Sequence, residues 1–135
     1  MSAFHYQIKV HFADVDPAGI MFYPRIFEMV NETIEEWFSS IGYSFSKIHM
    51  EDRAGIPLVK IEANFKKPSH LGEVLDFELM VGHLGGSSLE VEIIARGEGE
   101  ERFKVKAVLA HIDLDSKKAT PWPNEMKTEL QKWQV

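Results

Sequence analysis

The sequence predicts an α+β fold in which one long helix packs against an antiparallel sheet of about five strands. The helix is predicted because residues 24–41 repeat apolar side chains at the spacing of an amphipathic helix. The sheet is predicted because the apolar period changes to two between residues 58 and 113, as in strands with one buried face. Short turns separate these strands, and strands joined in this way pair antiparallel.

The composition is that of an ordinary globular protein, and we expect one domain spanning residues 1–135. The absence of cysteine excludes disulfides, thiolate metal ligands and a cysteine nucleophile. The formal net charge of −6 argues against a nucleic-acid partner, because such binding needs a basic face. The chain shows no signal-peptide pattern and no apolar run of the ~18 residues that a membrane span needs. A cytoplasmic protein is therefore expected.

The first predicted element is a strand over Tyr6–Phe12, in which apolar and polar residues alternate and one face is buried. The segment Asp14–Gly19 then ends the strand. Pro17 restricts Asp16 to extended geometry, and Gly19 can adopt a backbone conformation that is closed to other residues.

The main helix is predicted to begin at Pro24 and to end before Gly42. A proline is favourable in the first turn, where a missing N–H costs nothing, and a glycine is a common C-terminal stop. The apolar stripe of this helix comprises Ile26, Phe27, Val30, Ile34, Trp37, Phe38 and Ile41.

The remaining elements follow from the change of period and from the turns. A short helical turn is expected around Phe45–Met50, a hairpin at Gly85–Ser87, and a final helix from Asn124, as its cap, to Trp133. The predicted strands are Leu58–Phe65, Val74–Leu84, Ser88–Gly97 and Arg102–Asp113.

Asp16 is the candidate catalytic residue, because its carboxylate lies just before the predicted helix start. The N–H groups at a helix N-terminus are unpaired and carry partial positive charge. They can polarise an ester or thioester carbonyl and stabilise the oxyanion that follows. Pro24 has no N–H, so the Tyr23 N–H is the best donor. The alternative role for Asp16 is structural, since aspartates before proline often accept backbone hydrogen bonds within a turn.

Other catalytic motifs are missing from the sequence. It contains no Gly-x-Ser-x-Gly nucleophile elbow, no phosphate-binding glycine loop, and no metal-ligand spacing among its six histidines. His11 precedes Asp16 closely enough to assist it, although a strand-surface position is the simpler interpretation.

The stretch Phe12–Pro24, which reads FADVDPAGIMFYP, closely resembles the signature of hotdog-fold acyl-coenzyme A thioesterases of the 4-hydroxybenzoyl-CoA thioesterase class. The likeness continues through Pro68–Leu75 and through Asp113–Pro123, so it covers most of the chain. It implies a hotdog fold, in which an antiparallel sheet wraps around the long helix. It also implies a homodimer or homotetramer with active sites at the dimer interface.

The resemblance also implies the site residues. The catalytic aspartate of the family matches Asp16, and the backbone N–H that polarises the thioester carbonyl matches Tyr23. The position that reads the phenol of 4-hydroxybenzoyl-CoA holds Asn31 here, which indicates a different acyl group. The substrate-binding positions that we expect are Gly19, Asn31, Val59, Lys60 and Ser87, with Val59 and Lys60 contributed by the partner subunit.

We therefore predict an acyl-CoA thioesterase that hydrolyses an acyl thioester to a free acid and a thiol. Asp16 acts as nucleophile or general base, and the acyl group is carried by coenzyme A or by acyl carrier protein. No metal and no cofactor are expected, because coenzyme A is part of the substrate. The alternatives are a hotdog dehydratase or isomerase, which usually needs a histidine paired with an acid, and a non-catalytic acyl-binding dimer.

Overall fold

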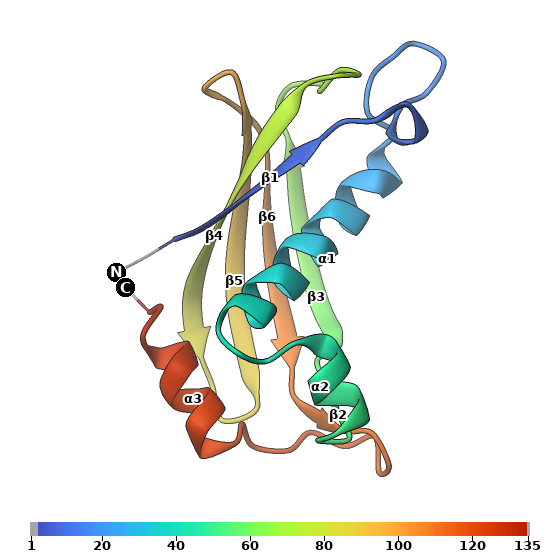
Figure 1. Ribbon diagram of the computed structural model, residues 1–135. Coiled ribbons are helices and arrows are strands. Elements are labelled where there is room, and N and C mark those ends of the chain that lie inside the picture. The colour runs from blue at the N-terminus through green and yellow to red at the C-terminus, as the bar shows by residue number, and fades with distance from the viewer. Residues whose placement is uncertain (1–2, 135) are drawn as a thin grey trace.

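A computed structural model describes residues 3–134, and it confirms the predicted α+β class (Figure 1). A five-stranded antiparallel sheet, with strand order β1-β4-β5-β6-β3, curves around the helix α1 (Figure 1). A second sheet contains only β2 and β7. None of the helices in residues 3–134 is long and apolar enough to cross a membrane. The elements are β1 Phe4–Lys9, a 3-10 turn Phe12–Asp14, α1 Tyr23–Ser40, α2 Phe45–Met50, β2 Ala54–Gly55, β3 Leu58–Phe65, β4 Val74–Leu84, β5 Ser88–Gly97, β6 Glu100–Ala110, β7 Ile112–Asp113 and α3 Asn124–Gln131.

Helix α1 forms because its apolar side chains recur on the face that the sheet covers. Trp37 and Phe38 are fully buried at its C-terminal end. The helix ends at Ser40, and Gly42, two residues further on, has a φ of +94°. The Gly42 N–H donates to the Ser39 carbonyl, and the Tyr43 N–H donates to the Phe38 carbonyl. This pair of bonds is a Schellman motif, and it confirms the predicted glycine stop.

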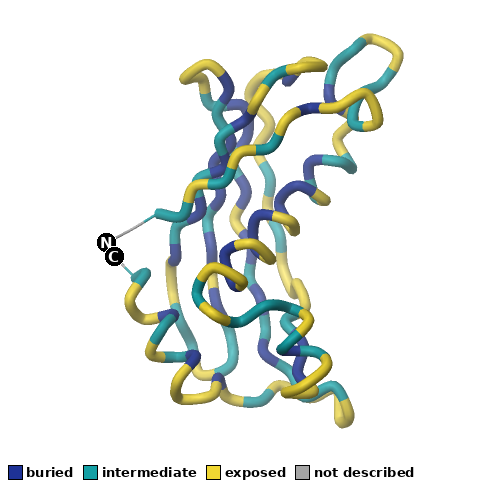
Figure 2. Tube along the Cα trace, viewed as in Figure 1, coloured by how far each residue is buried: buried dark blue, intermediate teal, exposed yellow. Residues whose placement is uncertain are grey.

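The core lies between α1 and the concave face of the sheet (Figure 2). Alternate residues of the central strands β4, β5 and β6 point toward α1 and are buried, as the period of two predicts. The opposite face of the sheet carries charged pairs, such as Arg96 with Glu78 and Lys104 with Glu92. This asymmetry fixes which face of the sheet meets the helix.

The ends of two predicted strands were wrong. Strand β1 stops at Lys9 and the chain turns away at Phe12, whose side chain is 81% exposed instead of facing the core. The last long strand begins at Glu100, and it ends at Ala110 instead of continuing to Asp113. The His111 N–H still donates to the Ser87 carbonyl in the β5–β6 register, and the chain then leaves the large sheet because Ile112–Asp113 pairs with β2.

The cap of the final helix also differs from the prediction. Pro123 occupies the N-cap position, and Asn124 is the first helical residue, with no side-chain hydrogen bond at the cap. The Asn124 carbonyl accepts from the Thr128 hydroxyl at 3.0 Å. Two buried side chains, Met126 and Leu130, attach α3 to the core instead.

Candidate active site

The Asp16 loop, residues 12–22, is a closed turn that connects β1 to α1. The Gly19 N–H donates to the Asp16 carbonyl at 2.9 Å, and the Asp16 N–H donates to the Ile20 carbonyl at 3.0 Å. Pro17 suits the second position of such a turn, and Gly19 has a φ of +79° that disfavours other residues. The sequence Asp-Pro-Ala-Gly therefore folds locally into the turn that it predicts.

The Asp16 carboxylate is half-buried and is partly used by its own loop. Its Oδ1 accepts from the Ala18 N–H at 2.9 Å. Its Oδ2 has no hydrogen-bond partner among the residues that the structure describes. The structural role expected of an aspartate before proline is thus present, and it leaves one carboxylate oxygen available.

The start of α1 offers a backbone donor. Tyr23 is the first helical residue, Phe22 occupies the N-cap position without a capping side chain, and Pro24 has no N–H. The Phe22 N–H is used, because it donates to the Asp14 carbonyl at 2.8 Å. Within residues 3–134 the Tyr23 N–H has no hydrogen-bond partner. It is a free donor at the positive end of an 18-residue helix.

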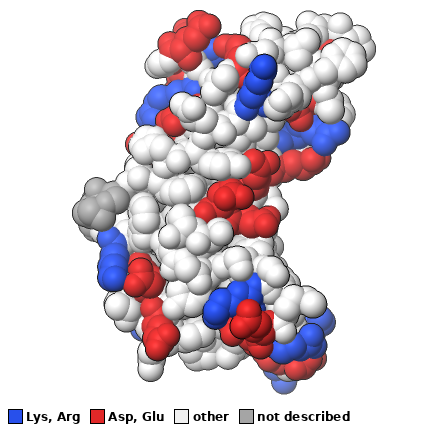
Figure 3. Space-filling view, in the orientation of Figure 1, with Lys and Arg blue, Asp and Glu red and all other residues white. Residues whose placement is uncertain are grey.

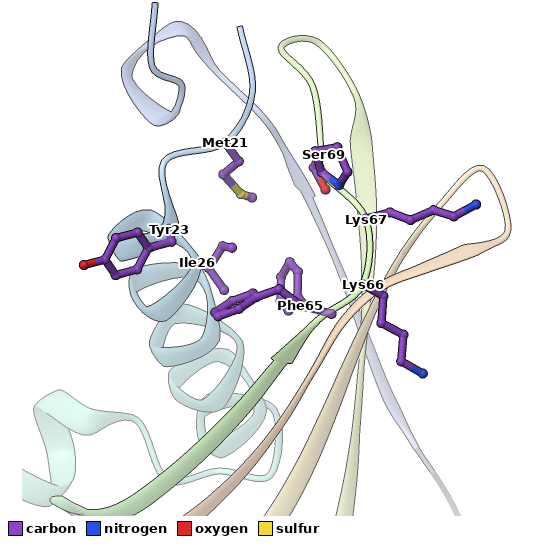
Figure 4. Close-up of a pocket in the computed structure, with 9 residues that line it drawn as sticks. Met21, Tyr23, Ile26, Phe65, Lys66, Lys67 and Ser69 are labelled. Atoms are coloured by element: carbon purple, nitrogen blue, oxygen red, sulfur yellow. The ribbon is translucent and has the colours of Figure 1, made fainter. Parts of the chain in front are cut away.

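A cleft of about 310 Å³ opens beside this helix start (Figure 4). Tyr23 and Ile26 of α1 lie on one side of it, and Phe65 at the end of β3 lies across from them (Figure 4). The cleft walls are mostly apolar, whereas Lys66 and Lys67 extend away from the helix (Figure 4). The complete lining is Met21, Tyr23, Ile26, Phe65, Lys66, Lys67, Pro68, Ser69 and Phe103.

The two lysines at the cleft are already paired with carboxylates. The Lys66 Nζ lies 2.6 Å from Glu101 Oε2, and the Lys67 Nζ lies 2.5 Å from Glu100 Oε2. The hydrogen bond from Lys66 is the main reason that the pKa of Glu101 is lowered. Because both cations are neutralised locally, the cleft is suited to an uncharged apolar group.

One chain brings together only some of the predicted site residues. Asp16, Gly19 and Tyr23 lie in the Asp16 loop and at the helix start that follows it, although the Asp16 side chain does not line the cleft. Asn31 is exposed farther along α1, beside a small apolar hollow of about 70 Å³. Ser87 lies at the opposite end of the sheet, in the β4–β5 hairpin (Figure 1).

The two predicted residues of β3 lie at the edge of the sheet. Val59 sits at an irregularity in the pairing of β3 with β6, and it is 60% exposed. Lys60 lines a shallow hollow with Glu90 and Lys106, and its Nζ lies 3.5 Å from Glu62 Oε1. Neither residue lines the cleft of its own chain.

A buried ion pair near the cleft was missed by the sequence analysis. Arg102, on β6, is only 4% exposed, and its guanidinium contacts the Glu73 carboxylate through two hydrogen bonds of 2.8 Å. The Arg102 hydrogen bonds lower the pKa of Glu73 to about 2. The only sequence signal was an arginine beside apolar strand residues, which does not identify a partner 29 residues away.

The exposed face of α1 carries several negatively charged side chains. Its carboxylates are Glu28, Glu32, Glu35 and Glu36, and they gather on the face seen in Figure 3. One of them, Glu32, accepts a 2.7 Å hydrogen bond from the Tyr6 hydroxyl. That bond raises the pKa of Tyr6 to about 12. This face is therefore a poor surface for the phosphates of a polyanionic ligand.

The sequence is similar to known thioesterases. Residues 10–130 match the family described as the thioesterase-like superfamily. A 1,4-dihydroxy-2-naphthoyl-CoA hydrolase of Acaryochloris marina is 25% identical over 134 residues, covering 96% of this chain and 97% of that protein. One from Prochlorococcus marinus is 28% identical over 115 residues, covering 80% of this chain and 75% of that protein.

Solved structures confirm the hotdog fold. The crystal structure of a 1,4-dihydroxy-2-naphthoyl-CoA thioesterase from Synechocystis superposes with a TM-score of 0.89 at 23% identity, covering 96% of each chain. A thioesterase-superfamily protein from Jannaschia superposes with a TM-score of 0.93 at 22% identity, covering 99% of this chain and 94% of that one.

Proposed function

The chain belongs to the thioesterase-like superfamily and is a thioesterase, and we propose that Asp16 and the start of α1 carry out hydrolysis of its acyl-CoA substrate. The observation that carries this proposal is the free Tyr23 N–H at an uncapped helix start. It adjoins a cleft with apolar walls, and the loop that leads into the helix carries Asp16. A donor of this kind is what the developing oxyanion of acyl transfer needs.

The proposed chemistry begins with the thioester carbonyl oxygen accepting a hydrogen bond from the Tyr23 N–H. Along the general-base route, the Asp16 carboxylate takes a proton from water as the water oxygen attacks the carbonyl carbon. The carbon–sulfur bond then breaks, and the leaving thiolate takes the proton from the Asp16 carboxyl, which returns the carboxylate to its starting state. Along the nucleophilic route, the carboxylate attacks the same carbon and expels the thiolate, which takes a proton from water, and a second water molecule then hydrolyses the resulting anhydride.

We also propose that a second copy of the chain completes the site in a homodimer or homotetramer. Strand β3 ends the sheet and pairs only with β6 among the described strands, so its outer edge is free for another strand. The same strand exposes Leu58, Val59 and Phe65. A partner's β3 placed near the Asp16 loop would bring the residues predicted at Val59 and Lys60 to the substrate.

The acyl group that we propose is apolar and aromatic. The cleft has aromatic walls, because Phe65 and Phe103 line it with ring centroids 6.4 Å apart. The relatives named above act on 1,4-dihydroxy-2-naphthoyl-CoA, which carries a fused aromatic acyl group. These two facts support aromatic acyl-CoA thioesters, with acyl carrier protein as the alternative carrier.

A substrate panel tests this function. Purified protein is mixed with benzoyl-CoA, naphthoyl-CoA, hexanoyl-CoA and palmitoyl-CoA, and the released thiol is measured with a chromogenic disulfide. We expect turnover of the aryl thioesters, and loss of most of that turnover in Asp16→Asn. An enoyl-CoA is assayed beside the panel, and its hydration without thiol release would support the dehydratase alternative. Tight retention of acyl-CoA without turnover would support the acyl-binding dimer, and either result would contradict the proposal.

A further inference from the structure

We propose that Arg102 and Glu73 act as a positioning pair that holds the Asp16 loop in its catalytic arrangement. The inference rests on the proposed function, because it concerns the geometry of the residues assigned there. Neither residue is proposed to touch the substrate. Their effect passes through one turn, residues 68–73, which contains Glu73 and is bonded to the Asp16 loop.

The pair is rigid because two parallel hydrogen bonds join two charged groups. The Arg102 Nη1 donates to Glu73 Oε1, and the Arg102 Nη2 donates to Glu73 Oε2, both at 2.8 Å. The arginine is buried and the glutamate side chain is 17% exposed. A two-pronged contact of this kind fixes orientation as well as distance.

The same two side chains bond to the backbone of the turn 68–73 at Pro68 and at His70. The Arg102 Nη1 also donates to the Pro68 carbonyl at 3.2 Å. Glu73 Oε1 accepts from the His70 N–H at 2.6 Å. The position of the turn is therefore set by the guanidinium of β6 and by the carboxylate that pairs with it.

Backbone hydrogen bonds join the turn 68–73 to the Asp16 loop. The Met21 N–H donates to the Ser69 carbonyl at 2.8 Å, and the Leu71 N–H donates to the Gly19 carbonyl at 3.0 Å. These bonds flank the bridge between Ile20 and His70. They fix the position of residues 19–21, which connect the Asp16 turn to the start of α1. Ser69 also lines the cleft, so the turn forms part of the cleft wall.

The space for the guanidinium is itself part of the fold. The Arg102 Nη2 donates to the Gly97 carbonyl at 3.1 Å. A Cβ at Gly97 would lie 2.8 Å from the Arg102 Cζ and 2.9 Å from Leu75 Cδ2. The absence of a side chain at Gly97 lets the arginine lie against β5 and reach the turn.

Loss of the pair should therefore displace catalytic groups without removing them. A misplacement of ~1 Å in a catalytic arrangement can lower a rate by about a hundredfold. We expect Glu73→Gln to lower kcat by at least tenfold, with a smaller change in KM, because the apolar walls of the cleft remain. Arg102→Lys should act in the same direction, since a single ammonium cannot form both bonds.

A double-mutant cycle with Asp16→Asn tests the inference, with kcat and KM measured on the best acyl-CoA of the panel. If the pair works through Asp16, Glu73→Gln lowers kcat in the wild-type background and adds little in the Asp16→Asn background. The matched control is Glu78→Gln, which breaks a 2.8 Å ion pair to Arg96 that has no bond to the Asp16 loop. That variant should keep the wild-type kcat. Circular dichroism confirms that each variant is folded.

Two results would overturn the inference. One is a Glu73→Gln effect on kcat that is equally large in both backgrounds, and the other is a Glu78→Gln effect of the same size. Arg102→Lys replaces Glu73→Gln in the cycle if the latter does not fold. A wild-type kcat in Asp16→Asn alone would instead remove Asp16 from the mechanism, so failure of the proposed function gives a different pattern.

Discussion

Glu73→Gln should make the stability of the protein depend less on pH. In the folded protein the pKa of Glu73 is lowered from 4.5 to about 2, mainly by the hydrogen bonds from Arg102 and further by the bond from the His70 N–H. Each pKa unit corresponds to about 1.4 kcal/mol, so the charged form contributes about 3 kcal/mol to the free energy of unfolding. The Glu73 side chain is only 17% exposed, so screening by solvent is limited.

Because the pKa of Glu73 is lower in the folded state than in the unfolded state, the free energy of unfolding falls as the pH falls. The contribution is complete above the unfolded-state pKa of 4.5, and it is lost as the pH falls through the folded-state value of about 2. Urea unfolding followed by circular dichroism measures it. We expect Glu73→Gln to be less stable by about 3 kcal/mol at neutral pH, with the difference falling to on the order of 1 kcal/mol near pH ~3.

The control for the urea-unfolding measurement is Glu62→Gln. Glu62→Gln breaks an exposed pair with Lys60 at 3.5 Å, and exposed pairs contribute less than about 1 kcal/mol. A Glu73→Gln deficit that does not change between neutral pH and pH ~3 would show that the Glu73 carboxylate does not carry the linkage.

Three further predictions concern the fold, the exposed face of α1 and the assembly. Gly42→Ala should destabilise the protein by about 1–2 kcal/mol, because Gly42 has a φ of +94°, which disfavours any side chain. Neither Gly42 nor Gly86 has an atom within 4 Å of an added Cβ, and Gly86 has no positive φ. Gly86→Ala should therefore be near neutral in the same urea assay. Tyr6→Phe should remove from the ultraviolet titration a tyrosine with a pKa of about 12, which Glu32 raises, and an unchanged titration would contradict that bond. Val59→Asp, at the free β3 edge, should shift the protein toward monomer in sedimentation velocity, whereas a wild-type profile would contradict assembly through this edge.

Local features of the sequence predicted most of the fold. The period of two, broken by glycine turns, gave the bounds of β3, β4 and β5 as the structure has them. Gly42 marked the end of α1 for a local reason, the left-handed conformation. Errors occurred where distant contacts decide. Strand β6 ends early because Ile112–Asp113 pairs with β2 and not with β5, and no local pattern shows that pairing.

The candidate site was predictable only in part, because some of its contacts join segments that are distant in the sequence. Asp16, Gly19 and Tyr23 belong to one continuous motif, so their proximity followed from the sequence. Arg102 and Glu73 meet through the pairing of distant segments, and their spacing in the sequence carries no signal. The predicted roles of Val59, Lys60 and Ser87 depend on a second chain and stay predictions.

The central claim, that the Asp16 carboxylate drives thioester hydrolysis, is tested most directly by kcat for two neighbouring variants. Asp16→Asn removes the charge and keeps an oxygen that can accept from the Ala18 N–H. Asp14→Asn does the same for a carboxylate that accepts from the His11 N–H at 2.9 Å in the same loop. We predict that Asp16→Asn lowers kcat on the preferred acyl-CoA by about a hundredfold or more, while Asp14→Asn stays near the wild-type value. Equal kcat values for the two variants would contradict the assignment.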